Sequence, residues 1–323
     1  MLYRHGLIRS TLWLALVLGA GAPRAGAGPG SGPEVGTAPT PALSFASDVA
    51  VVNIHATVTR DGEAIAGELE AGEFRVSEDG QPQEVTFFAH QDVPVTYTLL
   101  VDVSGSMSKR ARLVFEALET FIRTMRPGDR ASLVQFGTTA KVIQEETGER
   151  ETLLAATDRI PGEFEDGTAL YEVLFGHFWQ AVETQSCRAG SGARRCALVV
   201  FSDGKDESSR RSFERDVLDA ARRAELAVYP IAMTWHSSFL ERLARETGGR
   251  VSYVSHGGEL ADAYRAIAAE VASQYTVGYV PRMQAVPGAW HPVRVTVARK
   301  GVTVRHRTGY FTPGTDRQAR ALD

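Results

Sequence analysis

Residues 93–273 contain strongly apolar runs that alternate with segments in which apolar residues recur every three or four positions. Five of the runs are typical of strands buried on both faces. They cover residues 97–103, 131–136, 197–203, 226–233 and 250–254. The segments 113–125, 170–182 and 213–224 predict amphipathic helices. Because strands and helices alternate, we predict an α/β fold with a doubly wound, mostly parallel sheet flanked by helices.

Both flanks of this region change to a period of two, which is typical of half-buried strands. On the N-terminal side, over residues 45–92, Asp-Gly pairs at 61–62 and 79–80 predict hairpin turns. On the C-terminal side, over residues 274–314, valines alternate with polar residues over 293–297. Each segment alone has few strands with one apolar face, and such hairpins are marginally stable in water. We therefore expect the two segments to pair into one small β module.

The first 27 residues have the three parts of a secretory signal peptide. Arg4 and Arg9 precede an apolar stretch over 11–20, and small residues follow up to Ala27, where we expect cleavage. An uncleaved membrane anchor is the alternative, but the apolar run is well short of the ~20 residues that span a bilayer. We therefore predict an exported protein, periplasmic or extracellular, with no membrane span after cleavage.

Two further segments lack the large apolar side chains that a folded core requires. The Gly-, Pro-, Ala- and Ser-rich segment after Ala27 predicts a flexible linker, and the polar C-terminal residues predict a disordered tail. The expected organisation is a signal peptide (1–27), a linker (28–44), an N-terminal β segment (45–92), an α/β domain (93–273), a C-terminal β segment (274–314) and a tail (315–323).

Charge and cysteine content limit the partners and the compartment. The chain carries 35 Lys and Arg against 39 Asp and Glu, a net charge of −4. The predicted signal peptide contains only basic residues among its charges, so cleavage makes the protein more acidic, which argues against nucleic acid as a partner. Cys187 and Cys196 flank a Gly-rich, basic loop, and in an oxidising compartment they predict a disulfide. The alternative is a pair of free thiols.

Candidate metal ligands follow the predicted strands. Asp102, Ser104 and Ser106 come directly after the first strand of the α/β region, within the sequence Asp-Val-Ser-Gly-Ser. Thr168 lies where a helix is predicted to begin, and Asp203 lies at the end of another strand. Carboxylates and hydroxyls at strand ends suit a hard divalent cation. The first motif alone has an ordinary alternative, because Ser and Asp are also common in the loop that caps a helix.

In order and spacing these five residues resemble the metal-ion-dependent adhesion site of von Willebrand factor type A (VWA) domains. The resemblance implies that Ser104, Ser106 and Thr168 ligate the cation directly, while Asp102 and Asp203 act mainly through bound water. Mg²⁺ suits such a site, and Mn²⁺ or Ca²⁺ would compete with it. An open coordination position would then accept an acidic side chain of a protein partner.

The whole predicted mature chain is similar to exported VWA-related proteins described from Acidobacteria. The similarity is carried by the N-terminal strands up to "QEVTFF", by "LLVDVSGSM", and by the C-terminal stretch from "YTVGYVP" to "RTGYF". It implies a metal-dependent protein-binding module, for adhesion or as a scaffold, and not an enzyme.

Two other functional classes stay open. One is a Mg²⁺-dependent hydrolase of the phosphoesterase kind with Ser104 or Asp102 as nucleophile, but no His stands near the motif to serve as a base, and no Gly-x-Ser-x-Gly elbow is present. The other is a subunit that works with an intracellular ATPase, which the signal peptide argues against.

Several side chains near the motifs have two interpretations. Acidic residues flank Thr168 and Asp203 and either form a solvated rim or face the ion; they are Glu163, Glu165, Asp166, Asp206 and Glu207. The eight histidines show no pair four residues apart on a helix, which argues against zinc. Trp179 falls near the apolar stripe of the second predicted helix, so we expect it in the core.

Overall fold

The computed structural model describes residues 51–90, 93–160, 166–184, 195–232, 236–255, 257–282 and 286–312 of the 323-residue chain. The predicted signal peptide, the linker, the tail, Cys187, Glu163 and Glu165 lie outside these residues. What we expect of them, and the residue boundaries of the six segments, therefore stay predictions. Among the described residues, no helix is long and apolar enough to cross a membrane.

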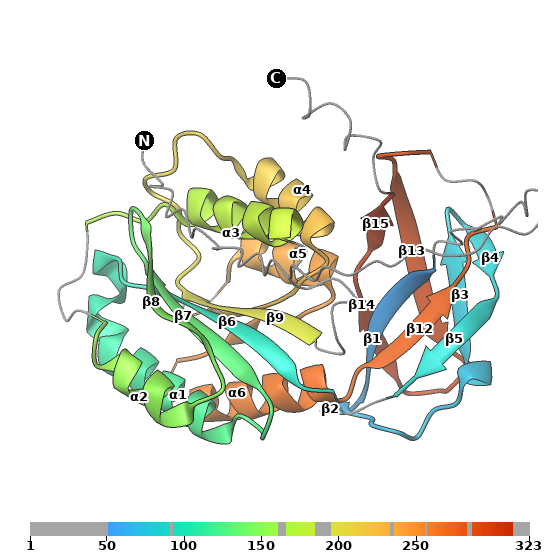
Figure 1. The fold of residues 1–323 in the computed structure, drawn as a ribbon, viewed down its shortest axis with the longest axis horizontal. Helices are drawn as coiled ribbons and strands as arrows, with labels where there is room; N and C mark the ends of the chain where they lie inside the picture. Colours follow the sequence, from blue (N-terminus) through green and yellow to red (C-terminus); the bar gives the residue numbers. More distant parts are fainter. Residues whose placement is uncertain are drawn as a thin grey trace, which may run out of the picture. The chain divides into compact units, whose positions relative to one another are not determined.

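The α/β domain contains a six-stranded sheet in the order β11-β10-β9-β6-β7-β8 (Figure 1). Its strands are β6 (Val95–Asp102), β7 (Arg130–Phe136), β8 (Ala140–Thr147), β9 (Arg195–Ser202), β10 (Ala227–Ala232) and β11 (Ser252–Tyr253). Neighbouring strands are parallel except for β8, which pairs antiparallel with β7. The predicted doubly wound, mostly parallel sheet is therefore confirmed.

Helices cover both faces of this sheet (Figure 1). They are η2 (Gly105–Arg110), α1 (Ala111–Thr124), α2 (Arg150–Thr157), α3 (Leu170–Thr184), α4 (Glu214–Ala224), α5 (Ser238–Thr247) and α6 (Gly257–Ala272). Side chains of α1, α2 and α6 pack on one face of the sheet, and those of α3, α4 and α5 pack on the other. Alternate residues of β6 serve the two cores, since Leu99 belongs to the first and Leu100 to the second.

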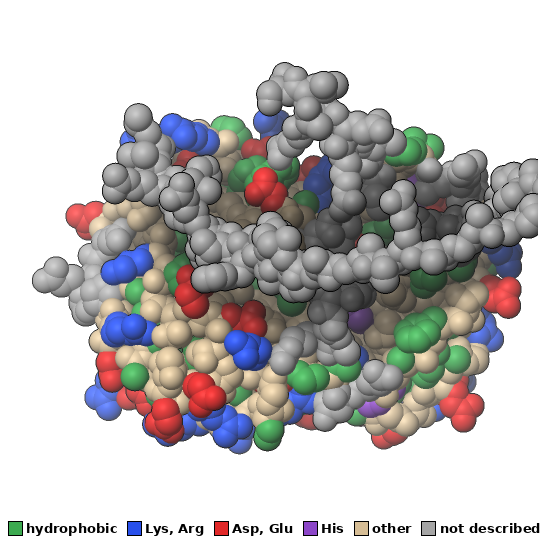
Figure 2. All heavy atoms as spheres, in the orientation of Figure 1, with side chains coloured by type: hydrophobic (Ala, Val, Ile, Leu, Met, Phe, Trp, Pro, Cys, Tyr) green, Lys and Arg blue, Asp and Glu red, His purple; other side chains and the backbone are tan. Residues whose placement is uncertain are grey.

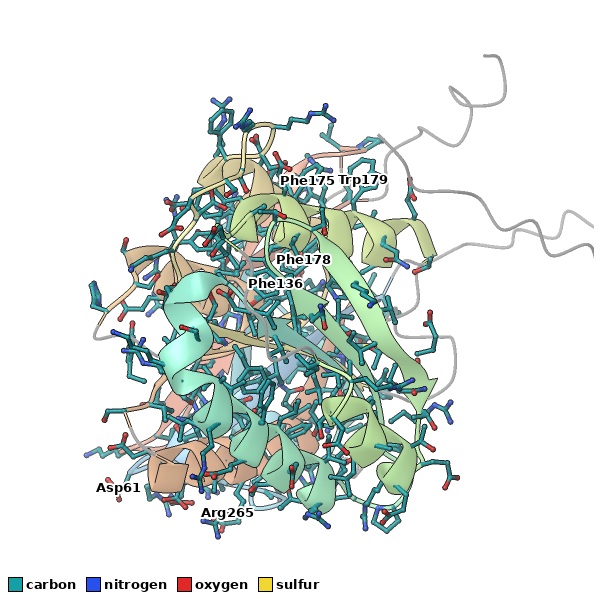
Figure 3. The ribbon with its side chains drawn as sticks, turned by 90° about the vertical axis from the view of Figure 1, so that its left-hand side faces the viewer. Asp61, Phe136, Phe175, Phe178, Trp179 and Arg265 are labelled. Carbon is teal, nitrogen blue, oxygen red and sulfur yellow. The ribbon has the colours of Figure 1, made fainter. Side chains whose placement is uncertain are left out.

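The prediction that Trp179 is a core residue is wrong. Trp179 is 40% exposed, and its ring stacks on that of Phe175 on the outer side of α3, whereas Phe178 is fully buried (Figure 3). Successive helix positions point about 100° apart, so a residue next to the apolar stripe turns toward solvent.

On the face of the molecule in Figure 2, acidic and basic side chains are interspersed.

The β module consists of two antiparallel sheets. One has the order β14-β1-β12-β5, with β2 beside β1, and the other has the order β15-β13-β3-β4. The elements are β1 (Val52–Arg60), β2 (Glu63–Ala64), η1 (Ala71–Glu73), β3 (Phe74–Glu78), β4 (Gln81–Gln83), β5 (Val85–Ala89), β12 (Tyr275–Tyr279), β13 (Trp290–Val297), β14 (Thr303–His306) and β15 (Gly309–Phe311). N-terminal β1 lies between C-terminal β12 and β14, and β3 pairs with β13. The predicted pairing of the two ends of the chain is therefore confirmed.

Both predicted hairpins of the β module are present. Asp61–Gly62 joins β1 to β2 and Asp79–Gly80 joins β3 to β4, and all four residues have positive φ. This is the backbone of the two-residue turn that matches the twist of the strands it joins. Inward-facing side chains of the two sheets form one apolar core, in which Phe74 packs against the ring of Tyr275.

Polar contacts connect the β module to the α/β domain. Buried Arg195, at the start of β9, donates hydrogen bonds to the carbonyl oxygens of Val271 and Ala272 and, where β12 is about to begin, of Gln274. From the β module, Arg307 pairs with Glu225 at 2.8 Å. These contacts involve the carboxyl ends of helices α6 and α4, where cations are favoured.

Candidate metal centre

The five predicted ligands come from three segments of the α/β domain, of which two follow the strands β6 and β9, while the third, with Thr168, lies between helices α2 and α3 and not at a strand end. Asp102 is the last residue of β6, and Asp203 comes directly after β9, the parallel neighbour of β6. Parallel neighbours end at the same edge of a sheet, so the two carboxylates lie on the same side. Thr168 stands two residues before α3, and its carbonyl oxygen accepts hydrogen bonds from the amides of Glu207 and Ser208, in the loop that begins at Asp203.

Asp102 is almost fully buried and its carboxylate is held in place from two sides. The amide of Ser104 donates to Oδ1 at 2.9 Å, and the hydroxyl of Ser202 donates to Oδ2 at 2.7 Å. Burial raises the pKa of Asp102, these hydrogen bonds lower it, and the nearby charge of Asp203 raises it. Two buried carboxylates that lie close together repel each other when both are ionised. A cation between them would stabilise the ionised form of both. Ser202 is a residue that the sequence reasoning missed.

The two serines of the motif lie together. Ser104 is 1% exposed and Ser106 is exposed, and their hydroxyl oxygens are 3.2 Å apart. Ser104 occupies the N-cap position of η2, but its side chain makes no capping hydrogen bond. The alternative that this motif is only a capping loop therefore explains the position of Ser104 and not the orientation of its hydroxyl.

Thr168 is fully buried, and its hydroxyl is left without a partner. Among the residues that the structure describes, no group makes a hydrogen bond with Oγ1 of Thr168. A buried hydroxyl in this state costs about 1–3 kcal/mol, so such groups are rare without a reason. A cation at the ends of β6 and β9 would give this oxygen the partner that it lacks.

Asp203 and the glycines beside the ligands show how tightly the loops pack. The amide of Lys205 donates to Oδ1 of Asp203 at 3.2 Å, and the exposed Lys205 ammonium lies 3.6 Å from Oδ2. Gly204 has φ +77°, and a Cβ there would lie 2.7 Å from Oγ of Ser237. Gly167 has φ +92°, and a Cβ there would collide with the hydroxyl of Ser208. Only glycine fits both constraints.

The flanking acids that the structure describes do not share one role. Asp206 accepts hydrogen bonds from the amide of Tyr171 at 2.9 Å and from the hydroxyl of Ser209 at 2.7 Å, so it anchors the loop to the start of α3. Asp166 and Glu207 are exposed, as expected of a solvated rim.

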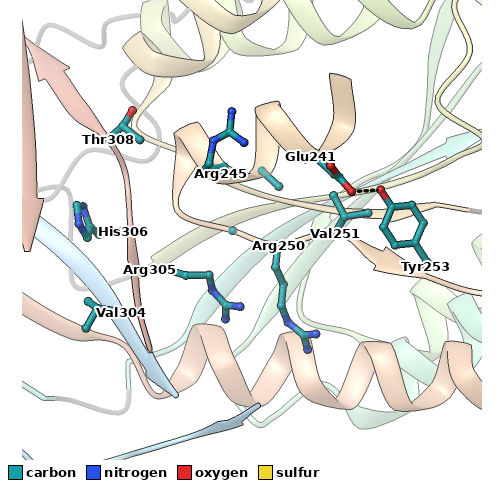
Figure 4. Close-up of a pocket in the computed structure, with 11 residues that line it drawn as sticks. Glu241, Arg245, Arg250, Val251, Tyr253, Val304, Arg305, His306 and Thr308 are labelled. Carbon is teal, nitrogen blue, oxygen red and sulfur yellow. Dashed lines mark hydrogen bonds between the residues drawn. The ribbon is translucent and has the colours of Figure 1, made fainter. Parts of the chain in front are cut away.

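A cavity of about 370 Å³ lies elsewhere, between α5, β11 and β14 (Figure 4). None of the five predicted ligands lines it. Two of its arginines, Arg250 and Arg305, both pair with buried Glu270, at 2.9 and 2.6 Å, and the hydroxyl of Tyr253 donates to Glu241. Much of its charge is therefore already compensated within the chain.

Comparisons with known proteins agree with a VWA-type domain. The family model described as von Willebrand factor type A domain matches residues 97–205. A protein of Mycobacterium ulcerans and one of Mycobacterium marinum, both named UPF0353 protein, are each 34% identical over 116 residues, which are 33% of this chain and 34% of the relative. The match thus spans about a third of the length of these curated relatives.

Solved structures with similar folds include a von Willebrand factor type A protein from Catenulispora acidiphila, at 14% identity and a TM-score of 0.47, over 85% of this chain and 76% of the other. Another is proximal thread matrix protein 1 from the mussel byssus with a zinc-occupied adhesion-site motif, at 15% identity and a TM-score of 0.45, over 56% of this chain and 48% of the other. Within the α/β domain, residues 97–205 thus match a von Willebrand factor type A domain, from strand β6 to the loop after β9.

Proposed function

We propose that this protein is an exported, metal-dependent protein-binding module, for adhesion or as a scaffold, and that its α/β domain engages an acidic residue of a protein partner through a divalent cation. The observation that carries the proposal is the buried, unpartnered hydroxyl of Thr168 beside the loop of Asp203. A polar atom left in this state, in a loop that is hydrogen-bonded to the loop of Asp203, fits a cation ligand better than a structural role.

The donor set consists of oxygen atoms only, which suits Mg²⁺, with Mn²⁺ or Ca²⁺ as competitors. Ser104, Ser106 and Thr168 would hold the ion through hydroxyls. Asp102 is already engaged by Ser104 and Ser202, so its part is to orient the motif and to supply negative charge. The ion, when bound, supplies an electrophilic position for a carboxylate oxygen of the partner.

Export and the disulfide are parts of the same proposal. The signal-peptide pattern of residues 1–27 supports a periplasmic or extracellular protein, and an oxidising compartment would favour a bridge between Cys187 and Cys196. Mass spectrometry of the exported protein, alkylated without reduction, tests both points, because it reports the new N-terminus and counts free thiols.

The hydrolase alternative finds less support in the described residues. The side chains of Asp102 and Ser104 contact each other, a backbone amide and serine hydroxyls. Among the described residues no histidine or lysine contacts either of them to serve as a base, and the carboxylate of Asp102 is already held by Ser104 and Ser202. The binding role requires only the ion and an open coordination position, so it is the function that we propose.

Calorimetric titration with Mg²⁺ and Mn²⁺ tests the metal centre. We expect one Mg²⁺ per chain for the wild type and none for the variant Asp102→Ala, Asp203→Ala, and this variant should also lose one Mn²⁺ relative to the wild type. Asp158→Ala is the matched control, because Asp158 is an exposed aspartate at the end of α2. Metal binding by the double variant equal to that of the wild type would contradict the proposal.

The partner is sought by affinity capture from periplasmic or surface extracts. We expect a protein that is retained by the wild type and by Asp158→Ala with Mg²⁺ and is released by EDTA. The double variant should not retain it. Retention that is the same with Mg²⁺ and with EDTA would exclude a role of the ion in the interface.

A further inference from the structure

A second group of metal-binding side chains lies in the β module. Glu78, Asp79 and His291 each offer one ligand atom, and these atoms all lie within 4.8 Å of one another. Glu78 ends β3 and Asp79 begins the hairpin, while His291 comes from β13, the strand that pairs with β3. Asp79 and His291 are 212 positions apart in the sequence, so no spacing rule connects them.

The backbone brings these three side chains to one point. Consecutive strand residues normally face opposite sides of a sheet, but Asp79 has φ +51°, which turns its carboxylate back beside that of Glu78. Nδ1 of His291 lies 2.7 Å from Oδ2 of Asp79 and 3.7 Å from Oε1 of Glu78. A nitrogen and two carboxylates therefore converge at the end of the β3–β4 hairpin.

Glu78 stands where the pattern calls for an apolar residue. The buried positions of β3 are Phe74, Val76 and Glu78, and the Glu78 side chain is only 4% exposed. Burying a carboxylate is costly unless a positive charge compensates it. In the described part of the chain no Arg or Lys lies within 4 Å of this carboxylate, which is approached by the hydroxyl of Tyr310 at 3.3 Å, by the hydroxyl of Tyr279 and by His291. Among the described residues the two carboxylates thus have no Arg or Lys in direct contact, and the nearby Arg307 lies over the ring of Tyr310.

A fully buried hydroxyl also lies beside the carboxylate of Glu78 without a hydrogen bond of good geometry in the described structure. Tyr279, on β12 of the facing sheet, is 0% exposed, and its hydroxyl has no hydrogen-bond partner of good geometry among the described residues. Burial first, then a weak hydrogen bond to Glu78 and the charge of that carboxylate, raise the pKa of Tyr279. Tyr310 approaches Glu78 from the other side, and its ring stacks on that of His291. The cluster therefore has buried polar atoms around it that its own contacts do not satisfy.

We propose that Glu78, Asp79 and His291 bind a divalent transition-metal ion of the zinc type. One imidazole nitrogen with two carboxylates suits Zn²⁺, whereas the all-oxygen set of the α/β domain suits Mg²⁺. Two positive charges would compensate both carboxylates. The Asp79 side chain is 42% exposed, which leaves a path for the ion from solvent. The ion would join the N-terminal hairpin to the C-terminal strand β13 and so fasten the two ends of the chain within the β module.

Zinc titration of the full chain, purified without a histidine tag, tests this site. The double variant Asp102→Ala, Asp203→Ala serves as the parent, and excess Mg²⁺ occupies weak oxygen sites. We expect one Zn²⁺ per chain. His291→Ala should abolish this binding, and Tyr310→Phe should weaken it by about tenfold, the lower end of the effect of removing a group that orients a ligand.

His236→Ala is the matched control for adventitious binding. Nδ1 of His236 lies 3.1 Å from a carboxylate oxygen of Glu241, but the His236 side chain is 64% exposed and no third ligand joins the pair in the described structure. This variant should bind Zn²⁺ as its parent does. Equal zinc binding by His291→Ala, or no zinc binding by the parent, would overturn the proposal.

Thermal unfolding gives a second readout that does not depend on titration. Zn²⁺ should raise the Tm of the parent and of His236→Ala, because an ion bound only by the folded state stabilises it. It should leave the Tm of Glu78→Gln unchanged, and this variant keeps the size of the side chain at position 78. A zinc-dependent rise in the Tm of Glu78→Gln equal to that of the parent would mean that the ion binds elsewhere.

Discussion

At the scale of single residues, Thr168 offers the sharpest test of the candidate metal centre, because its hydroxyl has no partner in the described structure. Thr168→Val keeps the shape of the side chain and removes the unsatisfied oxygen. We expect the metal-free variant to gain about 1 kcal/mol in free energy of unfolding, and its affinity for Mg²⁺ to fall less than that of Asp203→Ala. Chemical denaturation with EDTA and calorimetry with Mg²⁺ measure the two effects.

Thr157→Val is the control for that prediction. Thr157 is also buried, but its hydroxyl donates to the carbonyl oxygen of Leu154 at 2.7 Å. The control should lose stability by about 1 kcal/mol and bind Mg²⁺ as the wild type does. A loss of metal-free stability in Thr168→Val would show that its hydroxyl has a structural partner.

The sequence singled out the candidate ligands of the first site because they come in one recognisable order, and four of the five stand at or just after strand ends. It did not identify Ser202 as a partner of Asp102, since a polar residue before Asp203 carries no signal of its own. The cluster in the β module was missed for a different reason. The inward position of Glu78 follows from the alternation with Phe74 and Val76, but the pairing of β3 with β13 depends on tertiary structure.

At the scale of elements, the loop after β9 requires a glycine, whereas a glycine within helix α3 lowers the stability of that helix. Gly204 has positive φ, and a Cβ there would contact Ser237 and Leu240, whereas a Cβ on exposed Gly176 in α3 would meet no atom within 4 Å. Gly204→Ala should therefore destabilise the protein by more than about 1 kcal/mol, and Gly176→Ala should stabilise it by up to about 1 kcal/mol.

Denaturant unfolding of both glycine variants at equal metal concentration measures these changes. Gly204→Ala should also weaken Mg²⁺ binding, because Gly204 follows Asp203 directly. Equal stability of Gly204→Ala and the wild type would mean that the loop adopts another backbone conformation in solution.

The strands buried on both faces were predicted, but several elements were missed, among them helices α5 and α6, whose apolar positions do recur at helical spacing. Strand β8 is an edge strand in which most side chains are exposed, so its sequence has no continuous apolar run. Helix α2 has only eight residues and buries Leu153, Ala156 and Thr157, too few positions to define a helical stripe. Central strands are buried on both faces, so their sequences contain continuous apolar runs that predict them. The edge strand is only partly buried, so its sequence contains no such run.

At the scale of the whole molecule, His55 links acidity to the contact between the β module and the α/β domain. Burial, followed by the positive charges of Arg195 and Arg307, lowers the pKa of His55 to about 4, and Glu225 opposes this only in part. In the unfolded chain the pKa is about 6.5, so below that value the unfolded state binds more protons than the folded state. The contribution of His55 to stability should fall by at most about 3 kcal/mol as the pH decreases from about 6.5 to about 4, and His177, whose pKa is also lowered to about 4 by burial, adds a loss of its own.

Urea unfolding at several pH values, with EDTA present, measures this dependence. His55→Asn should lose less stability than the wild type over that range, because the asparagine side chain does not titrate. His236→Ala, which changes an exposed histidine, should follow the wild type. If the free energy of unfolding of His55→Asn depends on pH as steeply as that of the wild type, groups other than His55 cause the loss of stability in acid.

The closed β module predicts that the N-terminal strands cannot fold without the C-terminal ones. A chain that ends at Ser273 lacks β12 and β14, both neighbours of β1, and also lacks β13, a neighbour of β3. It would expose two edges of β1 and the apolar face that includes Ile54 and Phe74. We expect this truncated chain to aggregate and to have a lower Tm, although the candidate ligands of the proposed Mg²⁺ site are intact.

Two further truncations separate the loss of partner strands from a general effect of shortening the chain. A chain that ends at Thr312 keeps β1 to β15 and should match the full chain in solubility and Tm. A chain of residues 93–273 lacks both β segments but keeps both apolar cores of the α/β domain, so it should stay soluble and bind Mg²⁺. If the chain ending at Ser273 is as soluble and as stable as the one ending at Thr312, the N-terminal strands fold independently. The β strands at the two ends of the chain would then not depend on each other for their stability.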